Sequence, residues 1–197
     1  SVRTMAFFPD GRRLVTGGHF DGHARIWDLE NGIEDGPPLI GHSLPITSVA
    51  VSKRGLDVVT GGPDNKARVY DAASGFLKAE FDGGTSVIQS LRWFPDGRRL
   101  AFCSEKTIRI LNTQDSSVDE RPFHGHTQLI KSIAVSPHGR FIASGSNDGT
   151  LRFWNAVTRV QIGSPIPHSS PVNLVVFSPD GKSVLSVTED SQVRLWD

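Results

Sequence analysis

A serine, an aspartate and a histidine with a spacing that could support hydrolysis lie in the second half of the chain. In the stretch ASGSNDGTLRFWN, Ser144 and Asp148 are four residues apart, and His126 lies eighteen residues before the serine. In a hydrolase, the serine would be the nucleophile, the histidine its base and the aspartate the carboxylate that orients the histidine. The same side chains can also form a buried hydrogen-bond chain without any chemistry. The structural elements on which these residues lie are therefore needed to distinguish the two roles.

The composition excludes several classes of function. The chain has 197 residues, and its 21 Lys and Arg balance its 21 Asp and Glu, so no global field attracts nucleic acid or an acidic membrane. Cys103 is the only cysteine, which excludes an internal disulfide framework and a cysteine-based zinc site. No apolar run approaches the roughly 20 residues of a membrane-spanning helix, and no signal peptide opens the sequence. We expect an intracellular protein, cytoplasmic or nuclear.

Five related units follow one another along the chain. Each ends in a short motif: ARIWD, ARVYD, IRILN, LRFWN or VRLWD. The fourth residues of these motifs are separated by 43, 41, 43 and 42 positions: Trp27, Tyr70, Leu111, Trp154 and Trp196. Each unit also carries an earlier turn motif: FFPDGRRL, VSKRGLDV, WFPDGRRL, VSPHGRFI or FSPDGKSV. Pro and Gly between apolar runs are typical of β-hairpins. The sequence therefore predicts a repeat architecture.

The pattern within each unit predicts strands. In the fourth unit these are 132–136, 140–146, 150–155 and 159–163, and we expect further fourth strands at 37–41, 76–81 and 119–123. No stretch of ten or more residues has a clean 3.6-residue period, so no helix is expected.

The units resemble the WD-repeat β-propeller family. The period of about 42 residues, the Gly-His dipeptides and the terminal Trp-Asp carry the resemblance, which covers the whole chain. It implies an all-β propeller of five consecutive four-stranded antiparallel blades, the last without its outer strand. The blades of this single domain, 1–197, would span about 1–41, 42–83, 84–125, 126–167 and 168–197. The third unit departs from the family, with Gly84 at the histidine position and Leu111 at the tryptophan position.

The repeat favours the structural role for the serine, histidine and aspartate. The same constellation recurs in three units, once with threonine, and Ser144 has no Gly-x-Ser-x-Gly elbow around it. WD-repeat proteins are known for a tetrad of this kind, a hydrogen-bond chain inside each blade. The resemblance assigns it to His42, Thr60, Asp64 and Tyr70; to His126, Ser144, Asp148 and Trp154; and to His168, Ser186, Asp190 and Trp196. We expect no enzyme activity and no cofactor.

The first unit has only Thr16, Asp21 and Trp27, because its histidine would lie before Ser1. The last unit stops at Asp197 without a fourth strand. These features suggest a segment of a longer array. Its five blades could form an incomplete arc, a tight five-bladed ring, or a ring completed by self-association with a second chain.

Other constellations have simpler interpretations. His19 and His23 flank Asp21 at a spacing that binds metal on a helix, but here an enlarged turn is favoured and no metal is expected. Paired glycines lack the following helix and Gly-Lys-Ser/Thr of a phosphate loop. An arginine lies two residues before the aromatic or leucine residue near the end of each unit, where its aliphatic stem can pack against apolar neighbours. These arginines are Arg25, Arg68, Arg109, Arg152 and Arg194. Cations in the Pro-x-Gly turns could meet an acidic partner, although a solvated rim is favoured.

The loops that carry the Gly-His dipeptides and the tetrad aspartates are the preferred interaction surface, because WD propellers often bind partners there. The candidate residues are Phe20, Leu44, Pro45, Asn65, Gln128, Leu129, Asn147, Ser170 and Glu189. The resemblance implies a non-enzymatic protein-interaction scaffold. Alternatives are a sensor or autoinhibitory module of a larger signalling protein, and binding of glycan or nucleic acid through the channel rim, with nucleic acid disfavoured.

Overall fold

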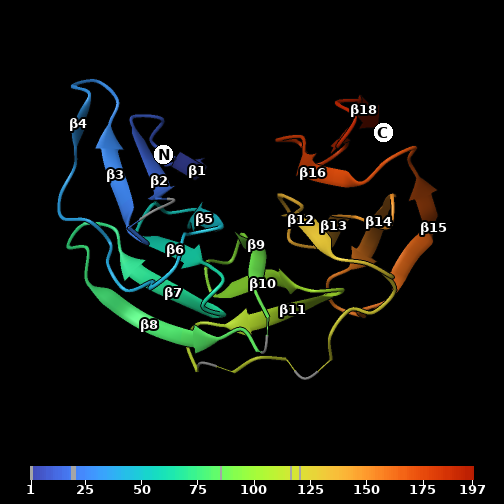
Figure 1. Ribbon diagram of the computed structural model, residues 1–197, viewed down its shortest axis with the longest axis horizontal. Helices are drawn as coiled ribbons and strands as arrows, with labels where there is room; N and C mark the ends of the chain where they lie inside the picture. The colour runs from blue at the N-terminus through green and yellow to red at the C-terminus, as the bar shows by residue number, and fades with distance from the viewer. Residues whose placement is uncertain (1, 19–20, 85, 116, 120) are drawn as a thin grey trace.

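The computed structural model describes residues 2–18, 21–84, 86–115, 117–119 and 121–197. In these ranges the chain forms eighteen strands and no helix, so no helix that could cross a membrane is found in them. The strands make five small antiparallel sheets, which follow one another as blades around one axis (Figure 1). The all-β propeller expected from the repeats is confirmed.

Each blade is a meander whose strands run in chain order from the axis outward. The first contains β1 (Val2–Phe7), β2 (Arg13–Gly18), β3 (Ala24–Asp28) and β4 (Ile33–Glu34). The second contains β5 (Ser48–Val51), β6 (Asp57–Gly61), β7 (Lys66–Asp71) and β8 (Leu77–Asp82). Among the described residues, the third contains β9 (Ile88–Trp93), β10 (Arg99–Ser104) and β11 (Thr107–Asn112) and no fourth strand.

The last two blades follow in the same order. The fourth contains β12 (Ile130–Val135), β13 (Phe141–Ser146), β14 (Thr150–Asn155) and β15 (Gln161–Pro167). The fifth contains β16 (Val172–Phe177), β17 (Val184–Thr188) and β18 (Val193–Trp196), and it has three strands as expected.

Two predicted outer strands were wrong. The segment 37–41 pairs with β3 only through Leu39, whose N–H and C=O both bond to Ala24. Pro37 and Pro38 have no N–H to donate, so the paired outer strand of this blade is the shorter β4. In 119–123, Pro122 likewise has no N–H to donate. The described residues of this range contact β11 through the Asp119 N–H, which donates to the Ile110 carbonyl at 2.8 Å, and through the isolated bridge between Phe123 and Ile108.

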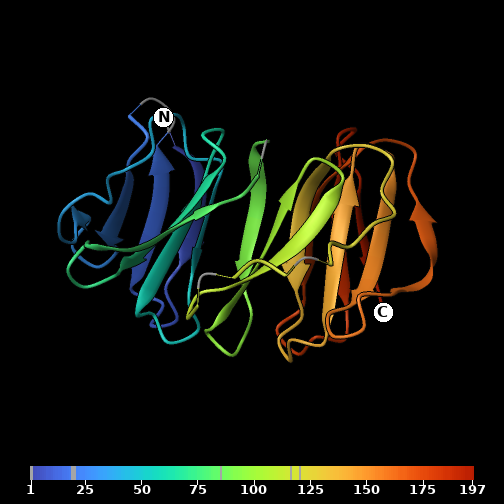
Figure 2. The same ribbon diagram turned by 90° about the horizontal axis from the view of Figure 1, so that it is seen from below.

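The strands run between two rims of the ring (Figure 2). The hairpin rim consists of the Pro-x-Gly turns and their counterpart in the second blade, at 9–11, 53–55, 95–97, 137–139 and 179–181. Gly11 in the first of these turns has a φ of 68°, a left-handed conformation that glycine adopts without strain. The histidine rim consists of the loops before β5, β12 and β16 and of the turns that carry the tetrad aspartates.

Apolar side chains fill each junction between neighbouring blades. At the junction of the fourth and fifth blades, Ala143 and Leu151 pack with Val172, Val175 and Val184, and all five are buried. Similar clusters lie at the other three junctions. Since each blade has two faces to cover, the core is divided among the junctions.

A hydrogen bond along the inner strands accompanies this packing. At three successive junctions, a backbone N–H of the later blade donates to a buried serine hydroxyl of the earlier one. The pairs are Leu91 to Ser48 (3.1 Å), Ile133 to Ser90 (3.3 Å) and Val175 to Ser132 (3.2 Å). The bond satisfies an inner-strand N–H that has no second strand beside it.

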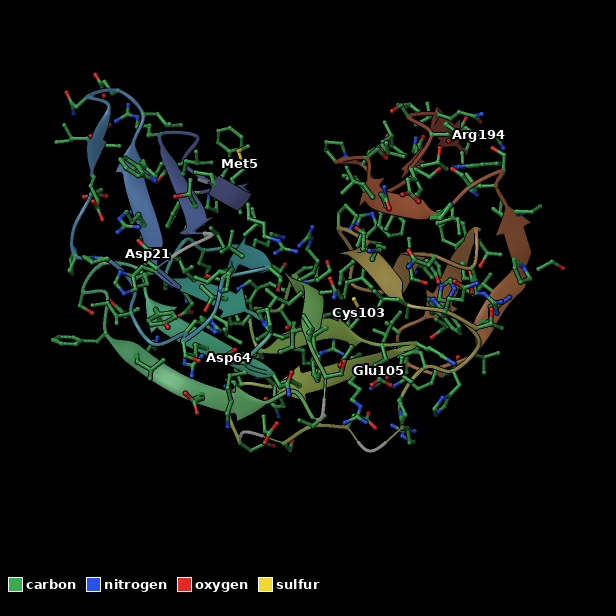
Figure 3. All side chains as sticks on the ribbon, in the orientation of Figure 1. Met5, Asp21, Asp64, Cys103, Glu105 and Arg194 are labelled. Atoms are coloured by element: carbon green, nitrogen blue, oxygen red, sulfur yellow. The ribbon has the colours of Figure 1, made fainter. Side chains whose placement is uncertain are left out.

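The junctions also need a small residue on the second strand. A Cβ added to Gly61 would lie 2.7 Å from a Leu91 methyl, and one added to Gly145 would lie 2.5 Å from a Val172 methyl. Cys103 takes this position in the third blade, where it is buried on the side of β10 that faces the fourth blade (Figure 3). Its thiol donates a weak hydrogen bond to the Ile130 carbonyl at 3.7 Å.

The end blades differ from the internal junctions. Figure 1 shows the ring open on the side where β1 and β16 face each other. Met5 and Phe7 on β1 are 62% and 65% exposed there. On the free face of the fifth blade, Leu174 and Val187 stand where the internal junctions have serine or threonine and glycine or cysteine. That face therefore lacks both features by which the internal blades receive a neighbour.

We expect Ser132→Ala to lower the free energy of unfolding by about 1–3 kcal/mol, because the buried N–H of Val175 would lose its acceptor. Urea denaturation followed by tryptophan fluorescence measures the change. Ser164→Ala, on an exposed part of β15, is the matched control and should change stability by less than about 0.5 kcal/mol. Equal effects of the two variants would contradict the role of the inter-blade bond.

Candidate functional site

The fourth blade contains a continuous hydrogen-bond chain through all four predicted residues. The Trp154 indole N–H donates to Ser144 Oγ at 2.8 Å, and Ser144 Oγ lies 2.7 Å from His126 Nε2. His126 Nδ1 lies 2.8 Å from Asp148 Oδ2. A neutral imidazole with its proton on Nδ1 satisfies every link, since the serine hydroxyl then donates to Nε2.

Burial sets the charge states in this chain. Desolvation lowers the pKa of His126, which favours the neutral ring. Burial acts to raise the pKa of Asp148, but hydrogen bonds from the Thr150 hydroxyl and from His126 outweigh it, so the carboxyl stays ionised. Ser144 is fully buried, and its oxygen already accepts the indole N–H, so no substrate carbonyl can reach it. The arrangement suits a structural role and not nucleophilic attack.

The second blade has the same core with a different outer end. His42 Nε2 lies 2.7 Å from Thr60 Oγ1, and its Nδ1 lies 2.9 Å from the Asp64 carboxylate. Arg68 adds an ion pair with Asp64 at 2.7 Å. The Tyr70 hydroxyl, where other blades have an indole, donates to the Ile40 carbonyl at 3.0 Å.

The fifth blade lacks the link between His168 and Asp190. Ser186 Oγ accepts the Trp196 indole N–H and contacts His168 Nε2 at 2.8 Å, but His168 Nδ1 faces the Ile166 carbonyl at 3.2 Å. Asp190 accepts hydrogen bonds from hydroxyls beside it. The predicted four-residue chain is therefore incomplete in this blade.

A proline explains the difference. In the second and fourth blades the histidine follows Gly41 or Gly125. A Cβ on Gly125 would lie 2.8 Å from the Arg152 guanidinium and 2.9 Å from the Trp154 ring. Pro167 stands at this position in the fifth blade, and its ring cannot occupy that space. In this blade the imidazole Nδ1 faces the Ile166 carbonyl and not Asp190.

The first and third blades hold less of the tetrad. In the first, Trp27 donates to Thr16 Oγ1 at 2.8 Å, and Arg25 contacts Asp21 at 2.7 Å. The hydrogen bond from the Arg25 side chain is the largest cause of the lowered pKa of Asp21. Asp21 and Asp64 mark equivalent turns of neighbouring blades (Figure 3). In the third blade, the buried Phe102 and Leu111 replace the hydroxyl and the indole.

The recurrent arginines brace the outer parts of the blades. Arg68 contacts Glu80 on β8 at 2.8 Å, and Arg152 donates to the Gln161 side chain on β15 at 2.9 Å. These contacts join the third strand to the outer strand.

The predicted interaction residues fall into groups on the histidine rim. Gln128 and Leu129 lie beside Asn147, whose N–H donates to the Leu129 carbonyl at 2.9 Å. Ser170 lies beside Glu189, which follows β17 and whose N–H donates to the Pro171 carbonyl at 2.9 Å. Within the second blade, Pro45 lies beside the turn that contains Asn65. Its carbonyl oxygen would be 3.2 Å from a Cβ added to Gly62, at the start of that turn.

Neighbouring blades also meet on this rim. Gly22, with a φ of 65°, lies against the second blade so closely that a Cβ would be 2.3 Å from the His42 carbonyl. Leu44, 45% exposed, is beside this contact. Gln128 and Glu189 are exposed, whereas Leu129 and Ser170 are half-buried. Phe20 lies outside the described residues, so the structure does not place it.

The histidine pair around Asp21 is only partly described, because His19 lies outside the described ranges. Asp21 accepts the backbone N–H of His23 at 3.1 Å, a local turn contact. Within the described part of the chain, no group of three or more His, Cys, Asp and Glu side chains could hold a metal ion.

Two adjoining cavities on the hairpin rim lie outside the preferred interaction surface, although Lys53 belongs to the turn cations for which an acidic partner was considered. They measure about 270 and 380 Å³, and Trp93 lines both. Arg92 lines the first and Lys53 the second. These three residues depart from the repeat at their positions, which is the signal that could have identified them from the sequence.

The sequence also matches a known family. The WD domain, G-beta repeat, matches five times, at residues 1–28, 37–71, 75–112, 118–155 and 160–197. The chain belongs to the WD-repeat family. Members of this family are generally non-enzymatic scaffolds that bind other proteins.

Curated WD-repeat relatives are considerably longer than the matched region. WD repeat-containing protein 18 of Danio rerio is 30% identical over 79% of this chain and 41% of its own length. Guanine nucleotide-binding protein subunit beta-1 of Nicotiana tabacum is 27% identical over 82% of this chain and 46% of its own. The Protein LST8 homolog of Drosophila melanogaster is 25% identical over 78% and 51%. The chain thus spans about half the length of these relatives or less.

We expect Asp148→Ala to lower the free energy of unfolding by about 1–3 kcal/mol, because His126 Nδ1 would be left unsatisfied inside the WD repeat. Asp190→Ala is the matched comparison and should have a smaller effect, since His168 makes no bond to Asp190. Chemical denaturation of both variants measures the difference. Unchanged stability of Asp148→Ala, together with loss of an ester-hydrolase activity, would contradict the structural role.

The tetrad histidines also predict a pH dependence. Burial is the main cause that holds the pKa of His42 and of His126 below the usual 6.5, whereas in the unfolded chain both titrate near that value. As the pH falls below 6.5, the unfolded state binds protons that the folded state does not, so stability decreases. Each histidine contributes at most about 1.4 kcal/mol per pH unit.

Urea denaturation between pH 7 and pH 5 measures this dependence, above the range in which the aspartates titrate. The variant His126→Gln should show a shallower decline than the unmodified chain, because it has one titrating group fewer. Parallel declines would show that this histidine does not contribute.

Proposed function

We propose that the chain acts as a non-enzymatic scaffold that binds a partner protein through its histidine rim. The contact surface comprises Leu44, Pro45, Asn65, Gln128, Leu129, Asn147, Ser170 and Glu189. Apolar and amide side chains dominate this set, and Glu189 is its one charged member. Such a mixture is typical of a protein interface with an apolar centre and a polar margin.

The observation that carries the proposal is the way in which the blades hold this rim. The His126 imidazole ties the loop before β12 to Ser144 and Asp148, and Asp148 also accepts the Thr127 N–H at 3.0 Å. The neighbouring Gln128 and Leu129 are therefore presented on a fixed backbone. A preformed surface binds with a smaller loss of conformational entropy than a mobile loop. The tobacco relative, named as a subunit, is compatible with this kind of role.

Affinity capture with site-directed variants tests the proposal. The chain and the double variant Leu44→Asp, Gln128→Arg would each be immobilised and exposed to an extract of the cells that produce the protein. The matched control is Arg140→Ala, an exposed residue on the hairpin rim. We expect the rim variant to recover about tenfold less of a specific partner than the chain and the control do.

Far-ultraviolet circular dichroism and thermal denaturation would verify that all three proteins are equally folded. Equal recovery of the same partner by the rim variant and the unmodified chain would refute the proposed surface. Loss with Arg140→Ala alone would assign binding to the hairpin rim instead.

A further inference from the structure

Three residues on the hairpin rim break the repeat at positions that the other blades conserve among themselves in type. Arg92 stands where the other blades have Ala6, Ala50, Ala134 and Val176. Lys53 stands where they have Pro9, Pro95, Pro137 and Pro179. Trp93, next to Arg92, is the one indole at a position otherwise occupied by Phe7, Val51, Val135 and Phe177. Five copies of one framework make such departures visible without any other sequence.

The three departures converge on the two adjoining cavities of the hairpin rim. Arg92 and Trp93 end the inner strand β9, and Lys53 lies in the turn after β5. The remaining walls that both cavities share are Val135, Pro137 and Pro179. The surface is therefore a depression of mixed polarity that is formed by four successive blades, with Arg92 in one cavity and Lys53 in the other.

Arg92 is a cation without a carboxylate. Its Nη1 donates to the Leu91 carbonyl at 2.7 Å, and no ion pair joins it to any described acidic side chain. Burial lowers its pKa, although a guanidinium remains protonated. Arg13 and Arg99 on this rim differ from it, since Arg13 pairs with Asp10 at 2.9 Å and Arg99 with Asp96 at 2.7 Å. A half-buried guanidinium without a counter-charge favours an anionic ligand.

Trp93 carries an unused hydrogen-bond donor. Its indole nitrogen is buried and has no partner among the residues that the structure describes. By contrast, the indoles of Trp27, Trp154 and Trp196 all donate to a hydroxyl within 2.9 Å. Buried indole N–H groups are normally satisfied, so this one marks a place where an acceptor is missing.

We propose that these cavities bind an acidic peptide segment in which a carboxylate lies beside apolar residues. The carboxylate would accept hydrogen bonds from Arg92 and from the Trp93 indole, with Lys53 adding long-range attraction. Its apolar neighbours would pack on Val135, Pro137 and Pro179. A single strong donor fork suits a carboxylate. The site lies on the opposite rim from the proposed scaffold surface and does not depend on it.

Nucleic acid fits this surface less well. Binding along a phosphate backbone needs a row of cations, whereas Arg92 and Lys53 are the two cations among the described residues that line these cavities. Val135, Pro137 and Pro179 give both cavities an apolar part of their wall, which suits aliphatic peptide side chains.

Fluorescence anisotropy with defined peptides tests the proposal. The probe is a fluorescein-labelled hexapeptide pool with one central Glu flanked by Leu, Val, Pro and Ala, and the matched pool has Gln in place of Glu. We expect the chain to bind the Glu pool at least about tenfold more tightly than the Gln pool.

Variants that restore the repeat identify the site. Arg92→Ala and Lys53→Pro introduce residues that other blades have at these positions, so both are compatible with the blade structure. Arg92→Ala should weaken binding of the Glu pool about tenfold, with a smaller loss for Lys53→Pro. Arg140→Ala, on the same rim but outside both cavities, should bind as the unmodified chain does. Gln128→Arg on the histidine rim should also leave peptide binding unchanged.

Several outcomes would overturn the proposal. Equal affinity for the Glu and Gln pools would exclude recognition of the carboxylate. Unchanged binding by a folded Arg92→Ala protein would place the peptide elsewhere. Displacement of the peptide by free glutamate at an equal concentration would show that the apolar walls do not contribute, and that the site takes a small organic acid. Tighter binding of a single-stranded oligonucleotide than of the Glu pool would assign the cations to nucleic acid.

Discussion

A backbone N–H that finds its acceptor in the preceding blade is the constraint on which the ring depends. An inner strand has a neighbouring strand on one side only, and the buried hydroxyls of Ser48, Ser90 and Ser132 supply the missing partner. The bond fixes how far one sheet is shifted along the next. Apolar side chains then interlock in a single register. The register also sets the positions of the loops on both rims, because each loop is displaced from its neighbour by the same step as its blade.

Two ways of filling a blade coexist in the chain. The fourth blade buries a polar chain from Trp154 to Asp148, which restricts the conformation because every donor and acceptor must be matched. The third blade has Phe102 and Leu111 in the corresponding places and relies on apolar contacts. Well-packed apolar groups can replace a buried polar network without loss of stability. The departure of the third unit from the family pattern is thus a substitution of packing for hydrogen bonding.

The architecture follows from the sequence because its strongest signals, the 42-residue period and the Pro-x-Gly turns, repeat five times. Outer strands were less predictable, since they are exposed and carry little burial pattern. At 37–41 the two prolines outweighed the apolar Leu39 and Ile40. The orientation of His168 depended on a single Gly-to-Pro replacement, which a match by residue type ignores. The Arg92 cavity arises from residues 40 or more positions apart, so only the assembled blades reveal it.

The lone cysteine places a thiol that can be chemically modified at one junction between blades. Cys103 occupies the small-residue position between the third and fourth blades, and burial raises its pKa to about 12. A thiol in that state is neither ionised nor accessible, so an alkylating reagent can reach it only after the two blades separate. The rate of its alkylation therefore reports how often that single junction opens, without an engineered cysteine.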